Sequence, residues 1–259
     1  MDTTTQPVIE VQGLEVGYDD SPVLKDLNFK VNKGDIFIVM GVSGCGKSTL
    51  LKAMIGLKKP TSGKVLFYAK SFWEIDEDEQ QNIMRRFGVL YQEGALWSSM
   101  TVGENVALPL QLYTKLSPQQ IQEIVALKLS LVGLEGQEDF FPSGISGGMC
   151  KRVSLARAIA LDPQIIFFDE PSAGLDPINA RKLDDLILEL RDGLGATVVI
   201  VTHELASIFA IGNNSVFLDE VSKTMIAAGN PKDLLANSQD PRVLEFLTRG
   251  QFKNEQKSQ

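Results

Sequence analysis

Apolar residues recur along this chain in two different rhythms, which predict two kinds of strand. In VIEVQGLEVGY (8–18) and LNFKV (27–31) they stand two apart, as in antiparallel strands with one face in water. DIFIVMG (35–41), IIFFDE (165–170) and TVVIVTH (197–203) are instead almost continuous apolar runs, typical of buried parallel strands, and helical patterns follow them. We therefore expect an α/β core with an antiparallel β flank.

Between residues 94 and 154 strand patterns nearly vanish and helical ones replace them. Ser117-Pro118-Gln119-Gln120 supplies an N-cap serine, a proline at the first helical position and a capping glutamine. A second helix is indicated near 183–194, where leucine and isoleucine recur at helical spacing. We predict an α/β core with its β flank from 1–93 and 155–230, an inserted α-helical subdomain at 94–154, and a C-terminal helix with a polar tail at 231–259.

Composition and charge exclude some classes of function for this chain. The chain has 259 residues, 44% of them hydrophobic, which is enough for a substantial core. Its net charge of -8 argues against nucleic-acid binding, because that affinity comes mainly from lysine and arginine neutralising phosphates. The N-terminal segment lacks the apolar region of a secretory signal, and the most apolar stretch is interrupted by His203 and Glu204. We expect a protein whose membrane attachment, if any, goes through a partner.

The segment GVSGCGKS (41–48) matches the phosphate-binding pattern G-x-x-x-x-G-K-[ST]. It follows a predicted buried strand and precedes a predicted helix, the context that the motif requires. Lys47 is expected to reach the β and γ phosphates of ATP, and Ser48 to bind Mg²⁺, while the loop backbone faces phosphate oxygens. The predicted nucleotide-binding residues here are Gly41, Ser43, Gly44, Cys45, Gly46, Lys47, Ser48 and Thr49.

Polar residues at the ends of the other apolar strands complete a predicted hydrolytic site. Asp169 ends IIFFD and is expected to reach Mg²⁺ through water, and Glu170 is placed to polarise an attacking water. Gln92 follows the short run VLY and has an amide oxygen suited to Mg²⁺ or water. His203, the single histidine, ends the third buried strand, where open α/β sheets bind ligands, and is expected at the γ-phosphate.

A second serine-glycine turn, ISGGM (145–149), leads into the helical pattern KRVSLARAIA. Such a turn at a helix N-terminus is a potential anion site built from backbone N–H groups and a serine hydroxyl. Taken alone, it is explained at least as well by an ordinary helix cap.

In their order along the chain, these motifs resemble the ATP-binding cassette (ABC) ATPases of transporters, a P-loop NTPase family with a RecA-like core. The resemblance implies a head-to-tail homodimer in which Ser146, Gly147 and Gly148 touch the ATP of the neighbouring subunit. It further implies that Asp176 communicates across the dimer and that Tyr18 stacks on adenine. Ile145 and Met149 depart from the usual L-S-G-G-Q signature, but its Ser-Gly-Gly is intact.

Several segments are similar to Mla-type phospholipid transport ATPases, notably YQEGALW (91–97), ARAIALDP (156–163) and DPRVLEFL (240–247). This resemblance implies a peripheral protein on the cytoplasmic face of the inner membrane, with an integral permease, a periplasmic lipid-binding MCE-type subunit and a small STAS-domain partner. Gly94, Ala95, Leu96 and Trp97 are then expected to dock the permease, although packing within the helical subdomain explains them as well. A cassette for an amino acid or a lipoprotein, or a soluble non-transport cassette ATPase, is the alternative.

Overall fold

The computed structural model describes residues 7–19 and 21–250, in two compact units. One unit is Met1–Gln80 with Thr197–Gln259, and the other is Gln81–Ala196. The predicted polar tail from residue 251 onward lies outside the described residues.

The first unit contains the antiparallel flank and the phosphate-loop strand. Its antiparallel sheet has the order β2-β1-β4-β5. These strands are β1 (Pro7–Tyr18), β2 (Ser21–Asn32), β4 (Ser62–Phe67) and β5 (Lys70–Ser71). In β1, Ile9, Val11 and Leu14 are buried and the residues between them are partly or fully exposed, although Val8 is buried as well. The alternating pattern therefore predicted both the strand and its buried face.

In the same unit the central strand β3 (Ile36–Met40) pairs in parallel with β8 (Thr197–Val201) and β9 (Asn214–Asp219). Strand β10 (Thr224–Ala228) adds to β9 antiparallel. All residues of β3 and β8 are buried, as the continuous apolar runs predicted. The helices that lie wholly in the described part of this unit are α1 (Lys47–Met54), α7 (Leu205–Ile211), α8 (Pro231–Asn237) and α9 (Pro241–Leu247).

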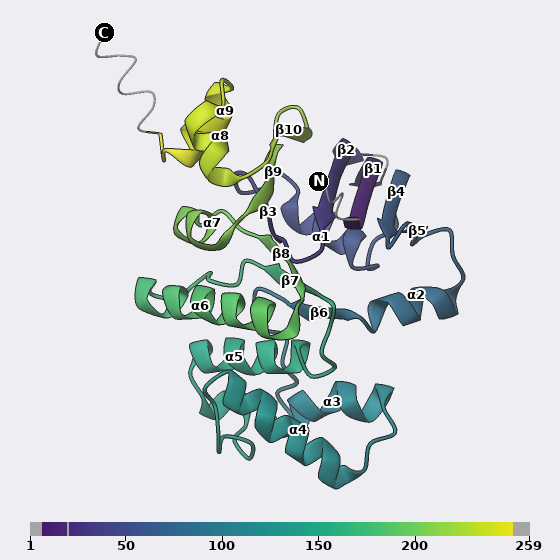
Figure 1. Cartoon of the computed structure of the whole chain (residues 1–259), viewed down its shortest axis with the longest axis vertical. Coiled ribbons are helices and arrows are strands. Elements are labelled where there is room, and N and C mark those ends of the chain that lie inside the picture. The colour runs from purple at the N-terminus through teal and green to yellow at the C-terminus, as the bar shows by residue number, and fades with distance from the viewer. Residues whose placement is uncertain (1–6, 20, 251–259) are drawn as a thin grey trace, which may run out of the picture. The chain divides into compact units, whose positions relative to one another are not determined.

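The second unit combines a parallel strand pair with helices (Figure 1). Strands β6 (Phe87–Leu90) and β7 (Ile165–Asp169) pair in parallel. Helices α3 (Val102–Tyr113), α4 (Pro118–Leu131) and α5 (Gly147–Ala158) pack on one another, and a 3₁₀ turn, η1 (Pro142–Gly144), precedes α5. Helix α6 (Pro177–Leu194) follows β7, and α2 (Glu77–Met84) contains the boundary between the units. The mixed α/β fold with a phosphate-loop core is thus confirmed.

Local signals set several of these helix starts. Ser117 caps α4 through the predicted capping box, in which its side chain accepts from Gln120 N and the Gln120 side chain accepts from Ser117 N. Thr101 and Glu104 form the same arrangement at α3. Helix α6 buries Leu183, Ile187 and Leu190, as its apolar spacing predicted.

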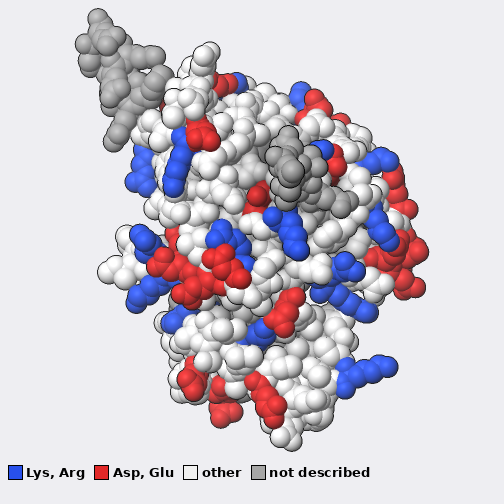
Figure 2. Space-filling model, in the orientation of Figure 1, with Lys and Arg blue, Asp and Glu red and all other residues white. Residues whose placement is uncertain are grey.

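Surface charge is mixed on the face shown in Figure 2, where lysines and arginines are interspersed with acidic side chains. No helix among the described residues is both long enough and apolar enough to cross a membrane.

Candidate nucleotide site and signature turn

The segment that joins β3 to α1 is a tight loop whose shape depends on glycine. Gly41, Gly44 and Gly46 have φ values of 151°, 85° and 101°, which side chains rarely tolerate. A Cβ on Gly41 would also lie 2.5 Å from the carbonyl oxygen of Leu218 and 2.7 Å from Cys45 Sγ. Around Gly44, by contrast, no atom lies within 4 Å of an added Cβ, so this part of the loop faces open space. These φ values and the close approach at Gly41 explain why glycine occupies these positions of the loop.

Lys47 places a buried positive charge at the first residue of α1. Its side chain is 6% exposed, and Nζ donates to the carbonyl oxygens of Gly41 and Val42, each at 3.0 Å. The ammonium group therefore lies against the loop and adds to the positive end of the helix dipole. Together they favour an anion at this loop.

The other polar residues of the loop are more accessible. Ser43 and Ser48 are exposed and Thr49 is half-buried. A hydroxyl at the position of Ser48, in the first turn of α1, suits a Mg²⁺ ion that arrives with phosphate, since Mg²⁺ is usually bound by few protein ligands together with phosphate oxygens. The described residues contain no group of three or more His, Cys, Asp or Glu side chains arranged to hold a metal ion.

Cys45 is 2% exposed inside the same loop. Burial raises the pKa of its thiol, an effect that outweighs the opposing charge of Lys47. We predict that maleimide modifies Cys45 much more slowly than an ordinary free thiol at neutral pH, with a rate that keeps increasing into the alkaline range because the thiolate reacts. The rate should be measured in Cys150→Ala, which removes the half-buried second thiol; modification of that variant as fast as a free peptide thiol would contradict this burial.

His203 and the phosphate loop line one cavity of the first unit, of about 550 Å³, to which Val42 and Ser43 also contribute. The histidine is exposed, with Nε2 3.7 Å from Glu204 Oε1. The structure therefore brings His203 to the same cavity as the predicted phosphate-binding residues.

Tyr18 ends β1 and is 46% exposed. Lys58 Nζ lies 3.9 Å from the ring centroid, a cation–π contact that covers one face. Lys58 thus covers one face of the Tyr18 ring, so the predicted stacking on adenine would use the opposite face.

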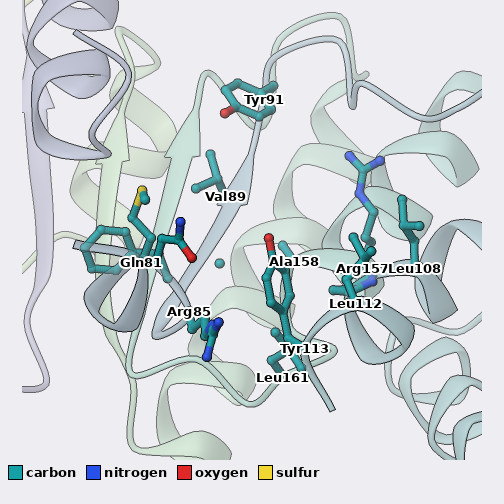
Figure 3. Close-up of a pocket in the computed structure, with 14 residues that line it drawn as sticks. Gln81, Arg85, Val89, Tyr91, Leu108, Leu112, Tyr113, Arg157, Ala158 and Leu161 are labelled. Atoms are coloured by element: carbon teal, nitrogen blue, oxygen red, sulfur yellow. The ribbon is translucent and has the colours of Figure 1, made fainter. Parts of the chain in front are cut away.

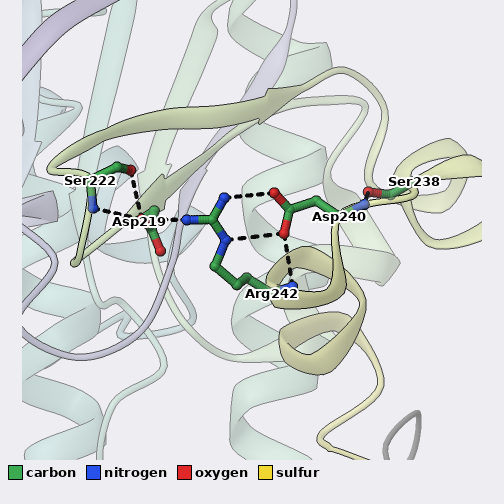
Figure 4. A network of polar contacts seen from close by, with 5 residues as sticks. All are labelled: Asp219, Ser222, Ser238, Asp240 and Arg242. Atoms are coloured by element: carbon green, nitrogen blue, oxygen red, sulfur yellow. Dashed lines mark hydrogen bonds and ion pairs between the residues drawn. The ribbon is translucent and has the colours of Figure 1, made fainter. Parts of the chain in front are cut away.

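A network of charged side chains holds the C-terminal helix α9 beside the cavity that contains His203 (Figure 4). The sequence did not predict this network. Arg242 Nη1 lies 2.8 Å from Asp219 Oδ2 and Nη2 lies 2.7 Å from Asp240 Oδ2. Burial opposes ionisation of Asp219, but hydrogen bonds from Ser222 and the charge of Arg242 outweigh it and keep the pKa of Asp219 below its ordinary value. Phe246 packs edge-on against Phe217, so the apolar side of α9 docks on β9.

In the second unit, β7 leads directly to the two predicted acidic residues. Asp169 is half-buried at the strand end, and Glu170 is buried at 8% exposure with φ of 48°. A left-handed conformation at a residue other than glycine costs energy and is often found at functional sites. The geometry is consistent with the predicted role of Glu170 in hydrolysis.

The signature turn and the segment after Glu170 share a second cavity, of about 720 Å³. Ser146 is the N-cap of α5, and its hydroxyl accepts from Met149 N at 3.3 Å, so the ordinary cap is present. Asp176 caps α6, and hydrogen bonds from Asn179, then from Ile178, lower its pKa. The predicted residues that line this cavity are Gln92, Ser146, Gly147, Gly148 and Asp176.

Two basic side chains of α5, absent from the sequence predictions, hold neighbouring segments. Arg157 donates from Nη2 to Gly94 O and from Nη1 to Ala95 O, each at 2.8 Å. Both residues follow Gln92 and have positive φ values. Lys151 donates to the carbonyl oxygens of Pro171 and Ala173, which follow Glu170. Because Lys151 and Arg157 lie within a helical sequence pattern, nothing in the neighbouring sequence indicates these distant hydrogen-bond partners.

The segment predicted to dock a permease is ordered by Asn105, which is fully buried. Its side chain accepts from Trp97 N at 2.8 Å and donates to the carbonyl oxygens of Trp97, Met100 and Thr101. Trp97 itself is 58% exposed, whereas Leu96 is half-buried. Packing of Trp97 within the helical subdomain is therefore not observed, and the indole is presented at the surface.

The same unit has a groove of about 600 Å³ (Figure 3). Leu112 and Tyr113 at the end of α3 line it and are 64% and 52% exposed. The guanidinium of Arg85 lies 5.3 Å from the ring centroid of Tyr113. An apolar groove with a basic rim is thus open to a partner.

Comparison with known proteins identifies relatives along nearly the whole chain. Residues 24–173 match the family model described as ABC transporter. The chain is 41% identical over 239 residues to the "Probable ribonucleotide transport ATP-binding protein mkl" of Mycobacterium leprae, covering 92% of this chain and 68% of that protein. It is 39% identical over 242 residues to the "Intermembrane phospholipid transport system ATP-binding protein MlaF" of Haemophilus influenzae, covering 93% and 90%. The Escherichia coli protein of the same name is 36% identical, with 95% and 91% covered.

Solved structures show the same architecture. The cbiO1 protein of Clostridium perfringens, described as part of the ABC transporter complex cbiONQ, has a TM-score of 0.81 at 28% identity and covers 96% of this chain and 99% of its own. MJ0796, described as a bacterial ABC transporter cassette in a dimeric structure, has a TM-score of 0.79 at 30% identity, with 86% and 98% covered.

Proposed function

This chain belongs to the ABC transporter family, as one of its ATP-hydrolysing cassettes, and we propose that it powers the transport of phospholipid between the inner membrane and the periplasm or outer membrane. The observation that carries the substrate assignment is the match to the two MlaF proteins, which extends over at least 90% of both partners. The mycobacterial relatives are slightly more identical, but this chain spans only 66 to 68% of their length. Ribonucleotide transport is therefore the second candidate, and an amino acid or a lipoprotein remains an alternative cargo.

For nucleotide binding we assign the phosphates of ATP to the loop 41–49, with Lys47 as its charged centre and Ser48 as a Mg²⁺ ligand. The open space at Gly44 and the buried ammonium of Lys47 support this assignment. Gln92 and Asp169 would complete the metal environment, the latter through water, and Tyr18 would contact adenine. When bound, Mg²⁺ neutralises phosphate charge during hydrolysis.

For catalysis we assign Glu170 as the residue that accepts a proton from the attacking water, and His203 as a contact to the γ-phosphate. The position of Glu170 directly after β7, buried at 8% exposure, supports its role, because a general base must be positioned within hydrogen-bond reach of the water it activates. The cavity shared by His203 and Ser43 supports the histidine assignment.

We further propose a head-to-tail homodimer in which Ser146, Gly147 and Gly148 close over the ATP of the other subunit, with Asp176 beside them. The N-terminus of α5 offers backbone N–H groups to a phosphate. The dimeric form of the MJ0796 cassette supports this arrangement. Closing on ATP and reopening after hydrolysis would drive the permease.

The permease is proposed to dock on the groove beside α3, with Trp97 as a second contact. We predict that Leu112→Asp reduces recovery of the permease with the tagged ATPase at least tenfold, because it places a carboxylate on the apolar groove. Leu127→Asp is the matched control, since Leu127 is 56% exposed on α4 and does not line the groove. Equal recovery with both variants would contradict docking in the groove, and Trp97→Ala tests the second contact separately.

The remaining proposed partners are a periplasmic MCE-type lipid-binding subunit and a small STAS-domain protein, with the ATPase held on the cytoplasmic face of the inner membrane through the permease. The test is to purify the tagged chain from its native cells in mild detergent and identify co-purifying proteins and lipids by mass spectrometry. A permease, an MCE-type subunit and bound phospholipid are expected. Recovery of a permease with a different binding protein would reject phospholipid as the substrate. Recovery of no membrane protein would favour a non-transport ATPase.

A further inference from the structure

Lys151 links α5, the helix that begins at the signature turn 145–149, to the backbone that follows Glu170. Its Nζ donates to Pro171 O at 3.0 Å and also to Ala173 O. The side chain is half-buried, about one turn into α5 from Gly147 and Gly148. A single ammonium group thus holds two carbonyl oxygens of one turn from the neighbouring helix.

The turn that Lys151 holds is continuous with Glu170 on one side and Asp176 on the other. Ala173 N donates to Glu170 O at 3.1 Å, and Leu175 N donates to Ser172 O at 3.0 Å. The hydroxyl of Ser172 is buried without a hydrogen-bond partner in the described part of the chain, so it does not anchor the turn. Glu170 needs such support, because its φ of 48° is not one that the residue would adopt by itself.

The charges agree with this geometry. Burial lowers the pKa of Lys151, and the nearby carboxylate of Glu170 opposes that effect. Lys151 therefore interacts with the charge of Glu170 and also contacts the backbone that follows Glu170. Because hydrogen bonds weaken steeply with distance and angle, a small shift of α5 would alter both contacts to the turn.

We propose that Lys151 is a positioning residue that transmits the state of the signature turn to Glu170 of the same subunit. This inference rests on the proposed function, in which the signature turn contacts the ATP of the neighbouring subunit and Glu170 serves its own. Lys151 then couples the two ATP sites of a dimer: closure of the signature turn on one nucleotide fixes the carboxylate that hydrolyses the other.

The test uses the full chain with Lys151→Met, which keeps length but removes the charge and donors, and Lys151→Arg, which keeps both. For Lys151→Met we expect kcat to fall about ten- to a hundredfold, since small misplacements of a reacting group have effects of that size. The Hill coefficient for ATP should fall toward one, and ATP affinity, compared in Glu170→Gln and Glu170→Gln/Lys151→Met, should stay within about twofold. Lys151→Arg should recover most of kcat.

Arg181→Met is the control, because it removes an exposed positive charge from α6 of the same unit and should leave kcat unchanged. A wild-type kcat and Hill coefficient in Lys151→Met would overturn the inference. So would a loss of kcat matched by an equal loss of ATP affinity and not recovered by arginine, since that pattern indicates a general structural defect. A wild-type chain that hydrolyses no ATP would instead reject the proposed function, and this inference with it.

Discussion

Replacing Glu170 with glutamine should reduce ATP hydrolysis by about a hundredfold to ten-thousandfold while leaving ATP binding intact. The range is that of general-base catalysis lost from a positioned side chain. Glutamine has nearly the same shape and fits the same buried position, but it cannot accept the proton of water. If the ATP-bound dimer opens only after hydrolysis, the variant should also remain dimeric with ATP.

Three measurements separate these effects: steady-state phosphate release, equilibrium binding of a fluorescent ATP analogue, and size-exclusion chromatography with and without ATP. Glu189→Gln is the matched control, because it removes an exposed carboxylate from α6 and should behave as the wild type. Hydrolysis by Glu170→Gln at the wild-type rate would exclude Glu170 as the base. Loss of ATP binding in that variant would instead assign Glu170 a structural role.

The strands that build the site were predictable because their signals are local. The continuous apolar runs at β3, β7 and β8 describe burial on both faces, and each strand lies where its run predicts. The glycines of the phosphate loop are equally local, since the turn itself demands positive φ. The cap of α5 by Ser146 follows from the same kind of short-range pattern.

The contacts that hold the site in place were not predictable, because they join residues distant in sequence. Lys151 reaches carbonyls about twenty residues away, and Arg157 reaches back more than sixty residues to Gly94 and Ala95. Both stand in a helical pattern in which a basic residue is most often solvated. The left-handed conformation of Glu170 is likewise invisible in the sequence, since glutamate normally avoids it.

The packing of the apolar residues near the C-terminus could not be predicted for the same reason. Val243, Leu244, Phe246 and Leu247 stand at the spacing of one apolar helix face, which does not indicate where that face packs. In the structure Val243 and Leu247 are buried, and Phe246 meets Phe217. Arg242 fixes the start of this helix to Asp219, a pairing that depends on how β9 and α9 are brought together. Periodicity predicts a buried face, whereas tertiary packing decides what covers it.

Lys47→Ala should abolish hydrolysis by a different route, through loss of nucleotide binding. Removing one partner of a buried, hydrogen-bonded charge pair typically costs about 2–5 kcal/mol, or roughly 30- to 4000-fold in affinity. Lys47 is buried in the loop, and its ammonium is the positive group that would face the phosphates. The variant should therefore bind ATP weakly.

Lys52→Ala is the control for Lys47→Ala, because Lys52 is an exposed lysine in the last turn of the same helix. For both variants, ATP binding should be measured by calorimetry, and thermal unfolding should be measured in the absence of nucleotide. Lys47 also donates to Gly41 O and Val42 O, so its loss frees two carbonyl groups, and a modest decrease in melting temperature is expected. Wild-type ATP affinity in Lys47→Ala would reject the assignment of the phosphate loop as the ATP-binding site. Weak binding there, set against the intact binding expected of Glu170→Gln, would separate the group that holds the nucleotide from the group that hydrolyses it.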